Sequence, residues 1–159
     1  MTYHIRVRAG AVIIENDAIL LVEFNDHNGL HYNFPAGGAE PGESVVETAK
    51  REAWEEAGVE VEVGPLAFVY EYTPHLNNER FGSTHSLGLM FDCKLVDGST
   101  VRQPAQPDPF QTGVKWIPLS ELENIVLYPN VKKQILEYAS GKREMELLEE
   151  HRLEQYVNK

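Results

Sequence analysis

Three glutamates, Glu52, Glu55 and Glu56, crowd the short segment TAKREAWEEAGV. If this segment is a helix, Glu52 faces Glu55 at i+3 and Glu56 at i+4, so the three carboxylates can converge. Like charges at this spacing destabilise a helix by roughly 0.2–0.5 kcal/mol per pair. Mg²⁺ and Mn²⁺ prefer oxygen ligands of this kind, and Mg²⁺ usually completes its shell with water and substrate phosphate oxygens. A divalent metal site would explain why the sequence tolerates the repulsion.

The alternative is a solvated acidic helix face. Lys50 and Arg51 are the only cations of the predicted helix, too few to neutralise the cluster, and acidic side chains in a last turn oppose the helix dipole. Arg51 is also placed to orient one of the carboxylates. The glycine-rich loop from Gly37 to Gly42 can bring bare backbone close to a metal or a phosphate. We therefore favour the metal site over the solvated face.

The predicted helix has well-marked ends. Pro41 and Gly42 make a turn before it, Ser44 with Glu47 three residues later fits a capping box, and Gly58 supplies the stop. A stripe of small side chains lets this helix approach a sheet closely, and it consists of Val46, Ala49, Ala53 and Ala57. The acidic cluster lies on the face next to that stripe.

Segments rich in β-branched and aromatic residues predict the sheet beneath the helix. A turn at Asn16 and Asp17 joins the first two segments into a hairpin. Residues 25–43 are dense in Asn, Asp, Gly and Pro, so we expect mostly loop, with at most a short strand near His31 to Phe34. The predicted strand segments are residues 4–14, 18–24, 59–72, 85–95 and 114–119.

Two helical segments are predicted near the end of the chain. Residues 130–140 form an amphipathic helix closed by Gly141, and residues 142–157 continue as a charged helical tail. Met145, Leu148 and Leu153 give this tail an apolar strip, which could dock on the domain or on a second copy, giving a homodimer. A solvated charged helix is the alternative.

Composition bounds the class of protein. The chain has 159 residues, 42% hydrophobic and 25% charged, which fits one globular domain, and no apolar run approaches the ~20 residues of a membrane helix. There is no signal-peptide pattern and one cysteine, Cys93, so we expect a soluble protein of the reducing cytoplasm. The net charge of −11 argues against a nucleic acid polymer or a membrane as partner. A small phosphorylated substrate would also be repelled by this charge, unless bound cations make the electrostatic potential at the site positive.

The residues around the glutamates resemble the Nudix box, GX5EX7REUXEEXGU, where U is a bulky aliphatic residue. Here the pattern is Gly37, five residues, Glu43, seven residues and then REAWEEAGV, so all seven fixed letters are present. A chance match somewhere in the chain is on the order of 10⁻⁶ at average residue usage. The one departure is Ala53, which is smaller than the usual aliphatic residue and affects packing more than chemistry.

The resemblance covers roughly residues 5–140. It implies an α/β fold, the Nudix-type α/β/α sandwich with a mixed β-sheet, in which the box forms a catalytic loop-helix-loop. We accordingly expect a Nudix hydrolase domain over residues 1–141 and a charged helical extension of the same domain over residues 142–159. The implied activity is hydrolysis of a nucleoside diphosphate linked to another moiety, by attack of water at phosphorus, with Mg²⁺ or Mn²⁺ as cofactor.

The resemblance also assigns roles to residues of the box. Glu52 would be both a metal ligand and a candidate base, and Arg51 would orient the glutamates. Glu43 would support the loop and the metal shell, and Gly37 could offer its backbone carbonyl to the metal. The implied metal ligands are thus Glu52, Glu55 and Glu56, supported by Gly37 and Glu43.

Many Nudix enzymes add a general base from a later loop. The loop before Trp116 contains Asp108, which is our candidate, whereas Gln111 and Thr112 stand nearer the tryptophan, where a glutamate is often found. Turn chemistry between two prolines explains this aspartate equally well. The identity of the base therefore stays open.

Two single residues favour ADP-ribose or a related nucleoside diphosphate sugar as substrate. Ala36 replaces the first glycine of the more usual Pro-Gly-Gly, and Pro74 lies sixteen residues beyond Gly58; both look like the ADP-ribose pyrophosphatase branch. Each also has a simpler explanation: Ala36 is equally well explained as a small loop residue, and Pro74 as the end of a strand. The alternatives are a nucleoside triphosphate, oxidised ones included, cleaved to release pyrophosphate, and a non-catalytic nucleotide sensor, which would not need the three glutamates.

Three residues outside the box are candidates for substrate binding. Arg8 and Arg80 could reach phosphates, and Phe81 could stack on a base. A solvated surface position explains the two arginines equally well. The expected partner is a small nucleotide in each case.

Overall fold

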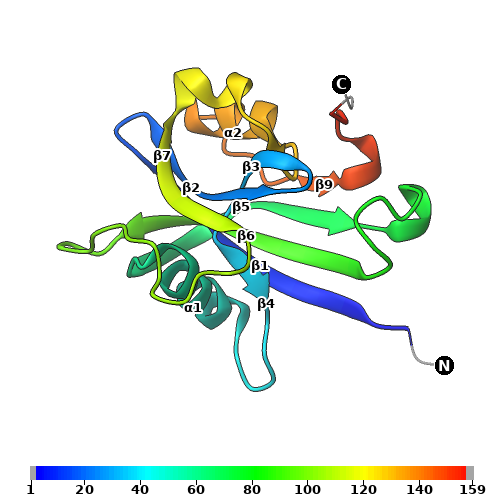
Figure 1. Ribbon diagram of the computed structural model, residues 1–159, viewed down its shortest axis with the longest axis horizontal. Coiled ribbons are helices and arrows are strands. Elements are labelled where there is room, and N and C mark those ends of the chain that lie inside the picture. Colours follow the sequence, from blue (N-terminus) through cyan, green and yellow to red (C-terminus); the bar gives the residue numbers. More distant parts are fainter. Residues whose placement is uncertain (1–2, 157–159) are drawn as a thin grey trace.

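The computed structural model describes residues 3–156, and within them the strands form one nine-stranded sheet of mixed direction (Figure 1). The order is β8-β3-β2-β1-β6-β5-β9, with β4 paired to β1 and β7 paired to β2. The strands are β1 Ile5–Glu15, β2 Ala18–Asp26, β3 Gly29–Asn33, β4 Ala36–Gly38, β5 Val61–Tyr72, β6 His85–Leu95, β7 Gln111–Pro118, β8 Leu127–Tyr128 and β9 Leu147–Glu149. The helices are α1 Val45–Ala57 and α2 Lys132–Ala139, with short 3₁₀ turns at Pro74–Leu76, Leu119–Asn124 and Glu150–Arg152.

Strand β1 joins the two halves of the sheet. Residues Ile5–Ile13 pair in parallel with β6, and the end of the strand pairs with β2 in the predicted hairpin. The turn residues Asn16 and Asp17 have φ angles of 51° and 59°, the left-handed pair that suits a two-residue hairpin. Strand β4 pairs with Arg8–Gly10 of β1, which places the start of the Nudix-like loop beside the middle of the sheet.

The two α-helices cover opposite faces of the sheet (Figure 1). Ala11 of β1 packs with α1, whereas its neighbour Val12 packs in a separate core with Ile135 of α2. Since successive strand residues point to opposite faces, this division confirms the predicted α/β/α sandwich with a mixed sheet. Within residues 3–156 neither helix combines the length and the apolar composition that crossing a membrane requires.

The small stripe of α1 is confirmed at three of its four positions. Ala49, Ala53 and Ala57 are fully buried, so the helix backbone lies close to the sheet. Val46 is 39% exposed, because it lies in the first turn at the margin of the buried face. Thr48 and Glu52 complete that buried face instead. One of the three metal-ligand candidates is therefore packed against the sheet.

The segment before α1 holds more strand than its composition predicts. Strand β3 pairs with β2 and β8, and β4 pairs with β1, so residues 29–33 and 36–38 are both in the sheet. Backbone pairing with distant strands outweighs the local preference of glycine and asparagine for turns. The pairing holds Gly37 and Gly38 rigidly under α1.

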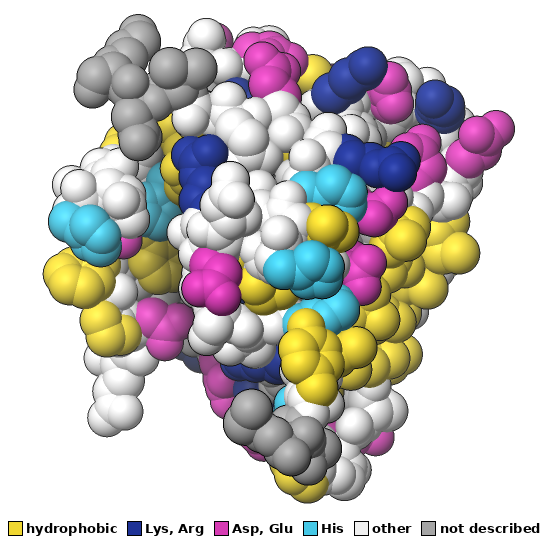
Figure 2. Space-filling view, turned by 90° about the vertical axis from the view of Figure 1, so that its right-hand side faces the viewer, with side chains coloured by type: hydrophobic (Ala, Val, Ile, Leu, Met, Phe, Trp, Pro, Cys, Tyr) yellow, Lys and Arg dark blue, Asp and Glu magenta, His cyan; other side chains and the backbone are white. Residues whose placement is uncertain are grey.

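The predicted helix over residues 142–157 is wrong. Strand β9 pairs in parallel with β5 and leads into the 3₁₀ turn Glu150–Arg152, while residue 157 lies outside the described residues. Leu148 is 6% exposed and belongs to the core, whereas Met145 and Leu147 are more than half exposed. This alternation is that of a strand with one buried face. Figure 2 views the side of the molecule where this segment lies, and hydrophobic side chains gather along one margin of that face.

Candidate active site

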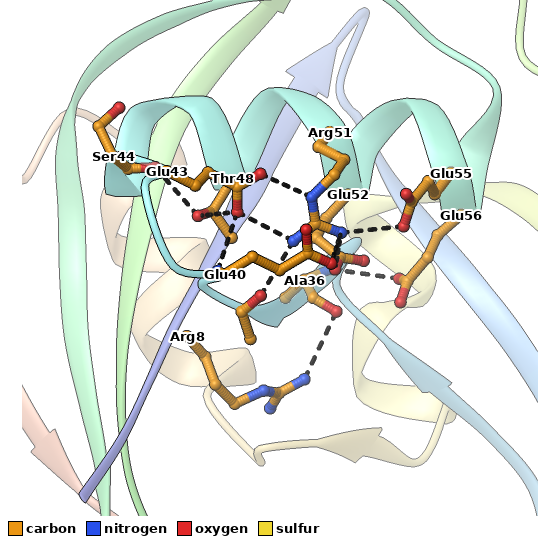
Figure 3. A network of polar contacts seen from close by, with 11 residues as sticks. Arg8, Ala36, Glu40, Glu43, Ser44, Thr48, Arg51, Glu52, Glu55 and Glu56 are labelled. Carbon is orange, nitrogen blue, oxygen red and sulfur yellow. Dashed lines mark hydrogen bonds and ion pairs between the residues drawn. The ribbon is translucent and has the colours of Figure 1, made fainter.

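Arg51 is the centre of a polar network on α1 (Figure 3). Its Nε donates to Glu43 Oε2 at 2.7 Å and its Nη2 to Glu43 Oε1 at 3.0 Å, a two-point pairing that fixes the guanidinium plane. Its Nη1 donates to Glu52 Oε1 at 2.8 Å and to Glu55 Oε2 at 3.0 Å. Its Nη2 also donates to the carbonyl of Gly38 at 2.9 Å. One arginine therefore contacts three carboxylates and the loop under the helix.

Glu43 ties that loop to the start of α1. The Thr48 hydroxyl donates to Glu43 Oε1 at 2.6 Å, and the hydrogen bonds from Arg51 and Thr48 lower the pKa of Glu43 to about 2. Next to it, the Ser44 hydroxyl accepts from the backbone N–H of Glu47 at 3.1 Å, as an N-cap does. The serine half of the predicted capping box is thus formed, and Glu43 is the residue immediately before this cap.

Glu56 is held on the other side of the helix face. One carboxylate oxygen accepts a hydrogen bond from the backbone N–H of Ala36 at 3.2 Å. Burial raises the pKa of Glu56 to about 8, and the nearby charges of Glu52 and Asp108 act in the same direction. A positive charge brought to this carboxylate would reverse that shift.

Gly37 allows Glu52 to sit where it does. A Cβ atom at Gly37 would overlap the carboxylate of Glu52, so only glycine permits this approach. The Glu52 side chain is 10% exposed, and burial raises its pKa while the hydrogen bond from Arg51 lowers it. The sequence predicts that the glycine-rich loop brings backbone atoms close to the site, and its first residue, Gly37, lies against the carboxylate of Glu52.

The donor chemistry fits a hard divalent cation. Glu52 is buried and Glu56 is partly buried, and the pKa of each is raised by desolvation and by neighbouring negative charge. Glu55 is half-exposed beside them. Within residues 3–156, however, no three acidic, histidine or cysteine side chains are grouped closely enough to hold an ion. Arg51 draws Glu52 and Glu55 to one side, while Ala36 holds Glu56 on the other (Figure 3). The convergence predicted from helix spacing is therefore not formed.

The acidic face of α1 opens into a cavity of about 860 Å³, here called the main cavity. The loop of residues 102–108 forms its opposite wall, and the Arg102 guanidinium lies 5.3 Å from the ring centre of Trp54. This size is within the range of small-molecule sites. The charged lining of the cavity consists of Arg6, Arg8, Arg102, Glu52, Glu55, Glu56 and Asp108.

Asp108, the predicted base, lines the same cavity as the acidic helix. Glu56 lines it as well, and the charge of Asp108 raises the pKa of Glu56. Asp108 belongs to a turn in which its backbone N–H donates to Gln111 Oε1 at 3.3 Å and its carbonyl accepts from the Gln111 N–H at 3.0 Å. The turn chemistry inferred from the sequence and the position next to the acidic helix are therefore both present.

A second pocket of about 190 Å³ adjoins the main cavity and is here called the aromatic pocket. Its volume is that of about six liquid water molecules. Arg8, Ala36, Glu56 and Asp108 line both pockets. The aromatic pocket is otherwise lined mainly by Phe24, Asn33, Phe34, Tyr70, Met90 and Tyr128.

Two buried polar atoms of the aromatic pocket have no hydrogen-bond partner within the described residues: Oδ1 of Asn33 and Nε of Arg8. Burying a polar group without a partner is costly, so such atoms tend to mark places where a ligand supplies the missing group. The Arg8 Nη2 donates to the carbonyl of Ala36 at 3.4 Å, which holds the guanidinium between the two pockets. The lining of the aromatic pocket thus includes a hydrogen-bond acceptor and a cation that each carry a buried atom left unpaired by the residues that the structure describes.

Arg80 and Phe81 do not line either pocket. The Arg80 guanidinium donates to Gln155 Oε1 and to the carbonyl of Tyr156, and Phe81 packs its ring edge-on against Tyr128, 5.6 Å between centres. They contact the C-terminal segment and the back of the aromatic pocket, respectively. Of the predicted substrate-binding residues, only Arg8 reaches a pocket.

The sequence interpretation did not single out Asn33 or Tyr128. Asn33 ends β3 four residues before the box, and Tyr128 lies in the two-residue strand β8, far along the chain. They meet because β3 and β8 pair at these positions. Nothing in the local sequence marks that pairing.

The fold and the acidic helix together define a class of hydrolase. The family model of the NUDIX domain matches residues 4–138, so the chain belongs to the NUDIX family and is a pyrophosphohydrolase of that family. NUDIX enzymes generally use divalent metal ions and act on small nucleotides. The match includes α1, both pockets and all of α2 except its last residue, and it ends before β9.

Individual relatives agree with this assignment. A Bacillus subtilis (strain 168) protein, named as a candidate 8-oxo-dGTP diphosphatase, is 30% identical over 135 residues, which are 84% of this chain and 79% of the relative. The solved structure of a NUDIX hydrolase from Nitrosomonas europaea is 28% identical, with a TM-score of 0.69 over 96% of this chain and 98% of that one. An ADP-ribose pyrophosphatase from Streptococcus suis 89-1591 is 24% identical, with a TM-score of 0.64 over 91% and 99%. The last likeness shows the fold alone.

Proposed function

We propose that this chain hydrolyses a phosphoanhydride bond of a nucleoside triphosphate, releasing pyrophosphate, with Mg²⁺ or Mn²⁺ held by Glu52, Glu55 and Glu56. The observation that carries the proposal is that two pockets of different chemistry meet at Arg8: the main cavity on the acidic helix and the aromatic pocket beside it. A nucleotide has the same two parts, a charged phosphate chain and a flat base. One molecule can therefore occupy both.

The residues of α1 would hold the phosphate end. A bound divalent ion would neutralise the phosphates and activate the attacking water. Arg51, which now pairs with Glu52 and Glu55, would orient these two carboxylates beside the ion, and Glu43 would hold Arg51. Asp108, which lines the main cavity together with Glu56, is the candidate to accept the proton of the attacking water.

The aromatic pocket would hold the base. Its rings offer stacking surfaces, and the unpaired Oδ1 of Asn33 can accept a hydrogen bond from an N–H group on the edge of a base. Arg8, between the pockets, would contact the phosphate nearest the sugar. A hydrogen-bond acceptor of this kind selects bases that carry a donor at that edge.

The triphosphate is favoured over ADP-ribose for two reasons. The Bacillus subtilis relative, which aligns with most of this chain, is named for 8-oxo-dGTP. Pro74, one of the two residues that favoured ADP-ribose, is buried at the start of a 3₁₀ turn and lines neither pocket. Ala36 lines both pockets and distinguishes neither substrate.

ADP-ribose or another nucleoside diphosphate sugar is the second candidate. The main cavity, at about 860 Å³, has room for a second sugar phosphate beyond the metal ligands. A non-catalytic sensor is not favoured. Withdrawing the carboxylates of Glu52 and Glu56 from water, Glu52 fully and Glu56 in part, costs stability, and a protein that binds nucleotide without metal has no use for that cost.

Product analysis separates these functions. Purified protein with Mg²⁺ or Mn²⁺ is incubated with GTP, 8-oxo-dGTP, ATP and ADP-ribose, and the products are resolved by chromatography. Pyrophosphate and a monophosphate from a triphosphate support the proposal; AMP and ribose phosphate from ADP-ribose alone support the second candidate. Nucleotide binding without products supports the sensor.

Metal removal and a matched pair of variants complete the test. EDTA should abolish turnover, and Glu55→Gln should lower it by roughly 10²-fold or more, because metal-assisted charge stabilisation is lost. The control is Glu60→Gln, which changes an exposed glutamate just beyond α1 that lines neither pocket. Full turnover in EDTA contradicts the metal requirement.

A further inference from the structure

The C-terminal segment of residues 144–156, here called the strap, is part of the fold and lies beyond the residues 4–138 that match the NUDIX model. Its strand β9 pairs with β5 at Val69–Glu71, and Leu148 is buried in the core. Tyr70, one wall of the aromatic pocket, is in the middle of that pairing. The strap therefore touches the aromatic pocket from outside.

The first contact joins Glu150 to Tyr70. The Tyr70 hydroxyl donates to Glu150 Oε2 at 3.0 Å, and Glu150 is 3% exposed. A buried carboxylate that accepts this hydrogen bond fixes the end of the tyrosine ring. On its other side Tyr70 shares the pocket lining with Arg8.

The second contact joins Tyr156 to Tyr128, the pocket wall on β8. The two rings meet edge-on, with centres 5.5 Å apart. The Tyr156 hydroxyl also accepts from the backbone N–H of Leu127 at 2.8 Å and donates to the Leu127 carbonyl at 3.2 Å. Tyr156 thus holds both the ring of Tyr128 and the backbone of the preceding residue, Leu127.

The end of the strap is anchored to the domain on two sides. Arg80 donates to Gln155 Oε1 at 3.0 Å and to the Tyr156 carbonyl at 3.3 Å, and the Asn130 side-chain amide donates to the Glu154 carbonyl at 2.9 Å. The Lys132 Nζ lies 5.0 Å from the ring centre of Tyr156. These contacts hold Tyr156 against Tyr128 and explain the position of Arg80 outside the pockets.

We propose that the strap sets the positions of the Tyr70 and Tyr128 rings and thereby the base selectivity of this chain. The inference rests on the proposed function only in taking the aromatic pocket as the base site. Base stacking and edge recognition depend on where the rings stand, so a displaced wall changes which base fits. Glu150 and Tyr156 are positioning residues in this account, because they touch the pocket walls and do not line the pocket.

Equilibrium binding tests the strap without requiring turnover. The dissociation constants of GMP, AMP, CMP and UMP are measured by calorimetry for the full chain and for strap variants, with pyrophosphate and Mg²⁺ as a ligand that lacks a base. Tyr156→Ala should weaken binding of the preferred monophosphate by about tenfold and reduce its preference over the others, because the Tyr128 ring loses the side chain that holds it in place for stacking. Pyrophosphate binding should stay within about twofold, since phosphate contacts lie elsewhere.

Smaller changes keep the test valid if Tyr156→Ala does not fold. Tyr156→Phe removes only the hydroxyl held by Leu127 and should weaken binding of the preferred base by about threefold. Glu150→Ala should act like Tyr156→Ala, whereas Glu150→Gln keeps an acceptor for Tyr70 and should restore selectivity. The control is Arg152→Ala, a strap residue whose side chain is 75% exposed and pairs only with Glu149 among the described residues.

The role of the strap and the proposed hydrolysis can fail independently, and the outcomes distinguish the two failures. Unchanged base preference in Tyr156→Phe and Glu150→Ala overturns the role of the strap, and so does equal weakening of nucleotide and pyrophosphate binding. Absence of monophosphate binding by the wild-type chain overturns it as well. Base-selective binding that depends on the strap, with no hydrolysis of any nucleotide, supports the strap and refutes the proposed function.

Discussion

The side-chain amide of Gln111 donates a hydrogen bond to the backbone carbonyl of Glu56, with 3.0 Å between nitrogen and oxygen. The carbonyl oxygen of the same amide accepts from the backbone N–H of Asp108 at 3.3 Å. Gln111 is 7% exposed, so the link is shielded from water. One side chain therefore connects the end of the acidic helix to the turn that carries the candidate base.

This link predicts that Gln111 and Asp108 act as one unit. Asp108→Asn should lower kcat by roughly 10²-fold, the usual scale for a general base. Gln111→Ala should lower kcat by about tenfold, because the Asp108 turn loses its attachment to α1 at the scale of one or two hydrogen bonds. The measurement is steady-state kinetics on both single variants and on the double variant.

A double-mutant cycle distinguishes positioning from general damage. If Gln111 acts through Asp108, adding Gln111→Ala to Asp108→Asn should cost little further activity. Thr112→Ala is the control, since its hydroxyl contacts Glu23 rather than α1. Fully additive losses in the double variant would contradict the link.

Glu56 should show opposite effects on activity and stability. Burial raises its pKa to about 8, so the metal-free fold disfavours the charged form and loses stability as pH rises from the unfolded value near 4.5 through 8. Glu56→Gln removes that charge. At pH 8 relief of even ~1 kcal/mol should raise the melting temperature of the metal-free protein by about 2–4 °C.

The same Glu56→Gln substitution should lower turnover by roughly 10²-fold or more, since it removes a proposed metal ligand. Thermal melting in EDTA at pH 5 and pH 8 checks the stability effect, which should be larger at pH 8. Glu47→Gln, in the exposed first turn, is the control and should keep full activity. If the Glu56→Gln protein melts at a lower temperature than wild type at pH 8, the charged Glu56 side chain does not destabilise the metal-free fold, and the prediction is refuted.

Much of the acidic helix could be predicted from the sequence because its determinants are local. Ser44 and Gly58 do begin and end α1, and Arg51 does contact the glutamates beside it. The separation of Glu55 from Glu56 could not be predicted in this way. It depends on Ala36, which reaches Glu56 only because β4 pairs with β1.

The aromatic pocket and the tail were missed for a related reason. Tyr70, Asn33 and Tyr128 come from three separate strands, and only the sheet order brings them together. The tail has the charged composition of a helix, but its backbone pairs with β5, which no pattern within residues 142–157 indicates. Long-range strand pairing decided both cases, and a single sequence carries little of that information.

Glu43 should stabilise the fold in a pH-dependent way. Its pKa is lowered to about 2, chiefly by the hydrogen bonds from Arg51, so its contribution is present above the unfolded pKa near 4.5 and is lost as pH falls toward 2. Glu43→Gln should therefore lower the free energy of unfolding at pH 7, and the difference from wild type should shrink below pH 4.5. Urea denaturation at pH 7, 5 and 3.5 measures this difference. A gap that is constant over this range would show that the Glu43 charge is not responsible.

Substitution of Asn33 should impair recognition of the base without lowering the stability of the protein. Its buried Oδ1 has no partner within the described residues, so Asn33→Leu, a change of similar size, removes an unpaired acceptor and should leave the melting temperature unchanged or raise it. The same change should lower kcat/KM about tenfold or more for a nucleotide whose base donates to that oxygen, because a buried partner is lost. Hydrolysis of a nucleotide without a donor at that edge should change much less. Asn28→Leu, in the exposed turn before β3, is the control. An equal loss of kcat/KM for every nucleotide would assign Asn33 to the framework of the pocket rather than to the reading of the base.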